Sequence, residues 1–226
     1  MTDDETTPDG PRRGRGTRAG LTAARIVEAA RDLDAETITV KAVADRLGVD
    51  RAAVHHHVSD VGALRQAVAF EAFTGNFGTL ALPPDADWRQ ACRLLALSMH
   101  GAVLAAKGLG VYVRLTAANV ALLEPVDRTL RIMTEAGFDD ETAARSLAAL
   151  TTMAGALARE QLIAQQPSGH PQVPELRLAL DEAESAHLPA LRRFARADLV
   201  DFDDTQLQMS IDLLLEGMAA RLTNTR

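Results

Sequence analysis

The chain has few of the residues on which several protein classes depend. Its 226 residues include one cysteine, one tryptophan and one tyrosine, and aromatic residues make up only 4%. The single Cys92 excludes a framework of disulfide bonds and is typical of a reducing cytoplasm. No apolar run reaches transmembrane length, and the first ten residues, MTDDETTPDG, are acidic rather than signal-like. We therefore predict a cytoplasmic protein with no membrane partner.

The signatures of the common enzyme classes are also missing. The sequence contains no Ser/His/Asp set, no phosphate-binding glycine loop, no paired acid and base and no metal-ligand spacing. His55, His56 and His57 are adjacent, but successive helical residues are turned by about 100°, so their rings do not converge on one ion. We expect no catalytic residue, no metal and no cofactor.

The composition that remains predicts an all-α protein. Hydrophobic residues make up 47% of the chain, and alanine and leucine dominate among them. Few segments are rich in β-branched residues, which favours helices over strands. At this length the chain has ample material for a buried core, in one large domain or two smaller ones.

Residues 38–64, ITVKAVADRLGVDRAAVHHHVSDVGAL, have the pattern of a helix-turn-helix. A short amphipathic helix ends at Gly48, the residue type that most readily adopts the left-handed conformation of a helix stop. Asp50 stands where it would cap a second helix of two turns, residues 51–57, and Ser59-Asp60 would cap a third. Two short helices in this order predict a DNA-reading motif whose second helix is the recognition element. The apolar positions of the two helices are Val43, Ala44, Leu47, Val54 and Val58.

Positive charge is concentrated ahead of this motif, although the whole chain has a net charge of −7. Residues 11–60 carry nine Lys/Arg against seven Asp/Glu, whereas residues 61–226 carry fifteen against twenty. The first 19 residues lack an apolar period and are expected to form a disordered basic arm. The arm either contacts DNA or is only a solvated tail, and its position beside the motif favours DNA. Its arginines are Arg12, Arg13, Arg15 and Arg18.

The rest of the chain predicts one further helical domain. We divide the protein into the arm (1–19), a DNA-binding domain with a connecting helix (20–74), and a ligand-binding and dimerisation domain (75–226). The caps and apolar periods predict helices over 22–34, 61–73, 87–107, 118–136 with a bend at Pro125, 139–165, 175–199 with a break at Pro189, and 203–222. A short segment is expected around 112–116, and PSGHPQVP is expected to be a loop.

The apolar faces of the helices 139–165 and 203–222 have two interpretations. They either fill the core of one subunit or form a two-fold interface with the same helices of a second copy. A protein with one helix-turn-helix usually dimerises to read two half-sites, which favours the homodimer. The face of the last helix consists of Leu207, Ile211, Leu214, Leu215 and Met218.

The chain resembles the TetR family of bacterial repressors, and the likeness extends beyond the DNA-binding motif. TVKAVADRLGVDRAAVHHHV and GALRQAVA match the family's motif in order, and WRQACRLLALSMHGAVL, LRIMTEAGF and ALAREQ resemble the second domain of tetracycline-responsive repressors. The likeness covers about residues 20–165, and the final helix, FDDTQLQMSIDLLLEGMAARL, is similar in kind. The resemblance implies an N-terminal DNA domain, a connecting helix, and an all-α ligand-binding and dimerisation domain.

The resemblance also implies which residues meet DNA. Base-reading positions fall on Val40 and Lys41 and on Arg51, Ala52 and Ala53. Arg51 is the best candidate, because a guanidinium bonds guanine O6 and N7 bidentately. Phosphate-contacting positions fall on His55 and His57 and at the start of the next helix. We add Thr39 and His56, which adjoin these positions, to the predicted DNA-contacting residues.

Three departures from the family pattern predict lower DNA affinity. Val61 replaces a phosphate-binding lysine, His55 replaces an aromatic residue, and the DAETI link before the motif is short and lacks a glycine. Backbone amides at the start of the helix after Asp60 could still bind phosphate.

For the effector, the family's contacts fall on Phe77, Leu95, Met99, Tyr112 or Val113, and Thr129. Tyr112 or its neighbour takes the place of the family's metal-binding histidine, and Glu160, which matches an acidic position, cannot alone hold a hydrated metal. We therefore expect a mostly apolar pocket for an aromatic, polyketide-like or lipophilic molecule, without a metal. The predicted lining is Phe77, Leu95, Met99, His100, Tyr112, Arg114, Asn119, Val126, Thr129, Leu147 and Glu160.

The predicted function is a dimeric repressor that leaves its double-stranded operator DNA when a small molecule binds. The alternative is a helical ligand carrier or enzyme whose helix-turn-helix is vestigial. Salt-dependent DNA binding distinguishes the two, because only the first requires it.

Overall fold

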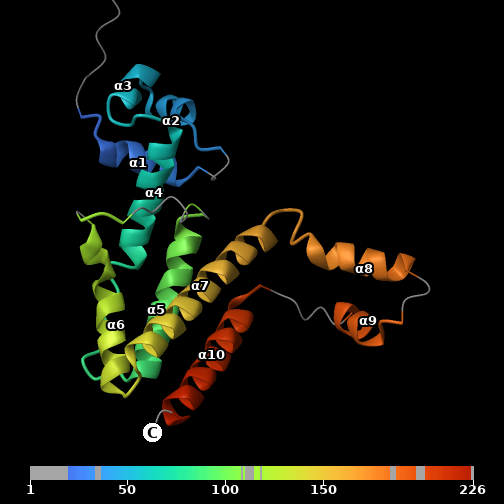
Figure 1. Ribbon diagram of the computed structural model, residues 1–226. Coiled ribbons are helices and arrows are strands. Elements are labelled where there is room, and N and C mark those ends of the chain that lie inside the picture. The colour runs from blue at the N-terminus through green and yellow to red at the C-terminus, as the bar shows by residue number, and fades with distance from the viewer. Residues whose placement is uncertain are drawn as a thin grey trace, which may run out of the picture.

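The structure of the protein is a computed structural model that describes residues 20–33, 37–107, 109, 115–117, 119–183, 187–196 and 202–224. Within these ranges all regular secondary structure is helical, which confirms the predicted all-α class. Figure 1 shows α1, α2 and α3 gathered at one end, with α4 leading from them toward the remaining helices. The predicted basic arm and the segment around Tyr112 lie outside the described residues.

The helix-turn-helix is built from the local signals that its sequence contains. α2 (Val40–Leu47) begins after Thr39, whose hydroxyl accepts a hydrogen bond from the N–H of Ala42 at 3.0 Å. It ends at Gly48, where φ is 65° and ψ is 34°, a conformation that costs glycine least. α3 (Arg51–His55) follows and is two residues shorter than predicted. Asp50 precedes it at the cap position, but its side chain makes no capping hydrogen bond.

α1 (Ala23–Arg31) and α4 (Val61–Asn76) complete the N-terminal core. α4 begins at the predicted cap, because a carboxylate oxygen of Asp60 accepts from the N–H of Ala63 at 2.8 Å. It extends three residues beyond its predicted end. The core also contains Ala106 and Leu109, which follow α5 (Trp88–Ala105). The second domain therefore contributes to the packing of the first. The largest buried side chains here are Ile26, Ile38, Val43, Val54 and Leu64.

The caps of the two long helices of the second domain are as predicted. Asp87 accepts from the N–H of Gln90 at the start of α5, and Asp139 accepts from the N–H of Thr142 at the start of α7 (Asp140–Ala164), each at 2.8 Å. Hydrogen bonds from the N–H and hydroxyl of Thr142 lower the pKa of the Asp139 carboxyl, so this cap remains a carboxylate.

The prediction of a helix over 118–136 bent at Pro125 is wrong. A short 3-10 helix, η2 (Val120–Leu123), comes first, and α6 (Glu124–Glu135) then begins with Pro125 in its first turn. Backbone N–H groups in the first turn of a helix have no acceptor within the helix. A proline, which lacks this N–H, can therefore start α6 without bending it. Gly137, with φ of 106°, follows the end of α6 as predicted.

α8 (Gln172–Glu182) and α9 (Pro189–Arg196) lie beside each other and to one side of the other helices (Figure 1). α8 begins inside the segment that was predicted to be a loop, whereas the predicted break before Pro189 is present. Two arginines join the pair: the Nε–H of Arg177 donates to the carbonyl of Ala195, and Arg192 donates to the carbonyl of Ala183, each at 2.7 Å.

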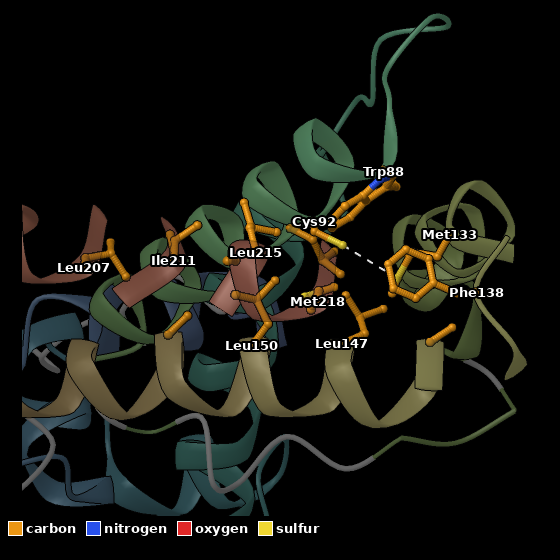
Figure 2. Packing of buried hydrophobic residues seen from close by; sticks show 14 of the residues in the cluster. Trp88, Cys92, Met133, Phe138, Leu147, Leu150, Leu207, Ile211, Leu215 and Met218 are labelled. Carbon is orange, nitrogen blue, oxygen red and sulfur yellow. Dashed lines mark hydrogen bonds between the residues drawn. The ribbon is translucent and has the colours of Figure 1, made fainter. Parts of the chain in front are cut away.

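The core of the second domain lies between α5, α6, α7 and α10 (Asp204–Asn224), as Figure 2 shows. The rings of Trp88 and Phe138 pack edge to face with their centroids 5.0 Å apart, and the sulfur of Cys92 lies 3.6 Å from that of Met133. Burial raises the pKa of the Cys92 thiol to about 12, so the thiol stays protonated.

The apolar face of α10 belongs mainly to the core of its own subunit. Leu207, Ile211, Leu215 and Met218 are each less than 5% exposed within one chain. The expectation that Leu215 forms a subunit interface is therefore corrected: it packs in the monomer core. Met209 and Leu213, on another side of α10, are 56% and 63% exposed. None of the helices in the described ranges combines the length and apolar character that spanning a bilayer requires.

Candidate nucleic-acid interface and ligand pocket

The recognition helix α3 is fixed on one side and open on the other. Val54 is fully buried in the N-terminal core, whereas Arg51, Ala52 and His55 are exposed and Ala53 is half-buried. Arg51 and His55 are four residues apart and thus share one face of the helix. Figure 1 shows α3 at the outer end of the molecule, far from α6 and α10. The exposed face is free to enter a DNA groove.

The start of α2 divides its predicted DNA contacts into two kinds. Thr39 and Lys41 are exposed. Val40 is only 6% exposed and packs in the N-terminal core, so the prediction that its side chain reads a base is corrected. A buried valine here holds α2 in place instead.

A set of hydrogen bonds joins the end of α3 to the start of α4. Nδ1 of His55 lies 3.2 Å from the carbonyl oxygen of Ser59, and the hydroxyl of Ser59 donates to Asp60 at 3.1 Å. The N–H of Ala63 and then the hydroxyl of Ser59 lower the pKa of the Asp60 carboxyl, so Asp60 caps α4 as a carboxylate. Because Asp60 occupies the N–H of Ala63, that amide is not available for the phosphate contact expected at this helix start.

Ion pairs neutralise part of the positive charge of this domain. Arg31 of α1 pairs with Glu71 of α4, and Arg46 of α2 pairs with Asp32. Lys41 and Arg51 are exposed and form no ion pair with an acidic side chain in the described residues. The arm arginines Arg12, Arg13, Arg15 and Arg18 lie outside those residues.

The adjacent histidines do not form a metal site. The rings of His56 and His57 meet edge to face at 5.5 Å, and all three imidazoles are exposed. In the part of the chain that the structure describes, no group of three or more His, Cys, Asp or Glu side chains is arranged to hold a metal ion.

The second domain contains an apolar cavity of about 450 Å³ between α4, α5, α6 and α7. Four of the predicted ligand residues line it: Phe77, Met99, Val126 and Leu147. Phe73 of α4 stacks on Phe77 with a ring separation of 4.7 Å and forms part of the same wall. The lining residues that the sequence reasoning missed are Phe73, Leu115, Leu123, Leu130, Ala144, Ala148 and Thr151.

Four other predicted ligand residues do not line this cavity. Leu95 and Thr129 are fully buried in the core, and the Thr129 hydroxyl donates to the carbonyl of Pro125 at 2.8 Å. His100 is also buried, and this burial lowers the pKa of its imidazole. Glu160 accepts from Nε2–H of His170 at 2.8 Å. The assignment of these four residues to the ligand site therefore stays a prediction that this cavity does not support. Tyr112 and Arg114 lie outside the described residues. Asn119 does not line the cavity either, and its side-chain oxygen accepts a hydrogen bond from the N–H of Thr116.

The lining residues that the structure describes offer a ligand almost no polar contact. Among them only Thr151 has a polar side chain, and its hydroxyl donates to the carbonyl of Leu147 at 2.9 Å. Ala144, Ala148 and Thr151 form a row of small side chains on α7 beside the core row that contains Leu147. That row is the sequence signal by which this wall could have been found.

A helix-turn-helix with an open recognition helix, joined by α4 to a second helical domain with an apolar cavity, defines the class as transcriptional regulators. Comparison with known proteins agrees. Residues 80–222 match the family model described as "Tetracyclin repressor-like, C-terminal domain". The chain belongs to the TetR family of transcriptional repressors.

The relatives match over most of the chain. Tetracycline repressor protein class A from transposon 1721 of Escherichia coli is 29% identical over 190 residues, which cover 78% of this chain and 87% of the relative. The class D protein of Escherichia coli is 25% identical over 213 residues, covering 91% and 92%.

Solved structures share the fold. A possible TetR family regulator from Streptomyces coelicolor A3(2) has a TM-score of 0.72 and 25% identity, covering 88% of this chain and 98% of that one. ActR from Streptomyces coelicolor in complex with actinorhodin has a TM-score of 0.66 and 23% identity, covering 89% and 97%.

Proposed function

We propose that the protein is a homodimeric repressor that binds operator DNA through α3 and is released by an uncharged, largely apolar or aromatic small molecule, without a metal. Its place of action is the bacterial cytoplasm, where the operator lies. The observation that carries the proposal is the apolar cavity, because two of its wall residues, Phe73 and Phe77, belong to the end of the helix that starts behind α3.

The chemistry of the cavity supports the choice of ligand. Burying apolar surface is favourable, whereas a charged group would lose hydration without gaining a partner among the lining residues that the structure describes. The acidic residue that could have served a metal, Glu160, is paired with His170 and does not line the cavity. Actinorhodin in the ActR complex shows that one protein of this fold holds a small molecule.

Release requires a ligand to prefer a conformation with misplaced recognition helices, since equal affinity for both conformations shifts nothing. The route proposed here starts at Phe73 and Phe77, follows α4 to Asp60 and reaches α3 through Ser59 and His55. Movement of α4 would change the spacing of the two recognition helices in a dimer.

The proposed dimer uses the helices predicted from the sequence, 139–165 and 203–222, now seen as α7 and α10. Support comes from the exposed side chains of Met209 and Leu213, which the core of one chain leaves uncovered. Two copies of such a face would meet across a two-fold axis.

The test begins with DNA. Fluorescence anisotropy should show binding to a duplex selected from a random-sequence pool, with an affinity that falls steeply as salt increases. Absence of salt-dependent DNA binding would favour the alternative of a ligand carrier or enzyme with a vestigial motif.

A screen of uncharged aromatic compounds by thermal shift should then identify a ligand, since a ligand at 100 times its Kd stabilises the folded state by about 2.7 kcal/mol. Ala148→Phe, which places a ring in the cavity, should abolish the shift. The same substitution at exposed Ala179 on α8 is the control and should leave it unchanged.

A further inference from the structure

One ring nitrogen of His55 already has a partner within the protein, so only the other is free to contact another molecule. Its Nδ1 lies 3.2 Å from the carbonyl oxygen of Ser59. A carbonyl oxygen only accepts hydrogen bonds, so Nδ1 must carry a proton and donate it. A neutral imidazole carries a proton on one nitrogen only. In neutral His55 the other nitrogen, Nε2, is therefore a bare acceptor on an exposed side chain.

This tautomer does not suit the contact with a DNA phosphate that the family resemblance implies for His55. A phosphate oxygen also only accepts, so neutral His55 would turn a lone pair toward a negative charge. Protonation gives Nε2 an N–H and makes the ring a cation, which can form a charge-assisted hydrogen bond to phosphate. We infer that His55 contacts the DNA backbone only as an imidazolium, so that DNA binding takes up a proton at this residue in each subunit. The inference rests on the proposed function.

Charged groups of both signs surround His55. Asp60 lies at the start of α4, and its carboxylate interacts electrostatically with His55. His55 is also the last residue of α3, and a helix C-terminus favours a positive charge. Arg51, one turn earlier on the same face, opposes it. The other charged groups on the neighbouring elements are Lys41, Asp45 and Arg46 on α2, Asp50 before α3 and Arg65 on α4.

The direction of the pH effect follows from proton uptake. Because binding takes up a proton at His55 in this proposal, the affinity for DNA increases as the pH falls and decreases as the pH rises. Imidazoles ordinarily titrate near pH 6.5, which sets the range of interest at about pH 5.5–8.5. Within it, the slope of log Kd against pH approaches about one for each proton taken up.

The experiment measures the affinity for a duplex selected from a random-sequence pool across this range, at constant ionic strength. His55→Gln places an uncharged amide near the Nε2 position, and His55→Arg supplies a permanent cation. His187→Gln is the matched control, since it alters an exposed imidazole outside the DNA-binding domain. Titration calorimetry in phosphate and in Tris at one pH gives an independent count of protons, because the two buffers differ in ionisation heat.

We expect the wild type and the His187→Gln control to bind about tenfold more tightly for each pH unit lost, at the steepest point, for each proton taken up. Both His55 variants should bind with little dependence on pH, and His55→Arg should exceed the wild type at pH 8.5. A slope that persists in His55→Gln, a slope that vanishes only in the control, or equal heats in the two buffers would overturn the inference. Failure to bind any duplex at any pH would instead refute the proposed function.

Discussion

The substitution Leu213→Glu is predicted to separate the two subunits without unfolding them. Fully burying a leucine side chain stabilises by about 1.5–3 kcal/mol. Because Leu213 is 63% exposed in one chain, an interface can gain about 1–2 kcal/mol from each copy. A two-fold interface uses both copies, which gives about 2–4 kcal/mol, or roughly a 30- to 1000-fold change in the dimer dissociation constant. The unpaired carboxylate adds its desolvation cost to this loss.

Sedimentation velocity over a concentration series measures the dissociation constant, and circular dichroism checks the fold. The matched variant is Leu215→Ala, two residues further along α10, where the side chain is 3% exposed. It should lower the free energy of unfolding by about 2–5 kcal/mol. If Leu213→Glu leaves the dimer intact, the exposed side of α10 is not the interface and the reasoning from exposure is refuted.

Two further predictions concern DNA. Arg51→Ala should cost about 1–3 kcal/mol of discrimination at one base pair of each half-site, because the guanidinium is exposed on the first turn of α3; equal preference for selected over scrambled DNA in both proteins would remove Arg51 from the readout. Deleting residues 1–19 should weaken binding to all DNA sequences and reduce the slope of log affinity against log salt concentration, because the deletion removes four arginines. An unchanged slope would mean that the arm does not touch DNA.

Local signals explain why so much of the fold could be predicted. The N-terminal caps Asp60, Asp87 and Asp139 and the stop at Gly48 each act within a few residues, so the sequence alone shows them. Pro125 has two possible roles in a helical segment, and the sequence does not show where that helix begins. The bend was therefore predicted in place of a helix start.

The positions that failed depend on packing between distant segments. Leu215 and Leu213 are both leucines of one helix, and only the placement of α5 and α7 determines which is covered. Leu95 and Thr129 were assigned to the pocket by resemblance, but the structure places both in the core. Phe73 was missed because a cavity wall is made by several helices and has no period of its own.

Release of DNA by an apolar ligand should require no metal. A labelled duplex is loaded with the protein, and an uncharged aromatic compound identified by thermal shift is titrated in, with and without EDTA, while anisotropy is followed. We expect full release at the same compound concentration in both buffers, and no release from Ala148→Phe. Loss of release in EDTA, or full release from Ala148→Phe, would contradict the metal-free cavity as the site of induction.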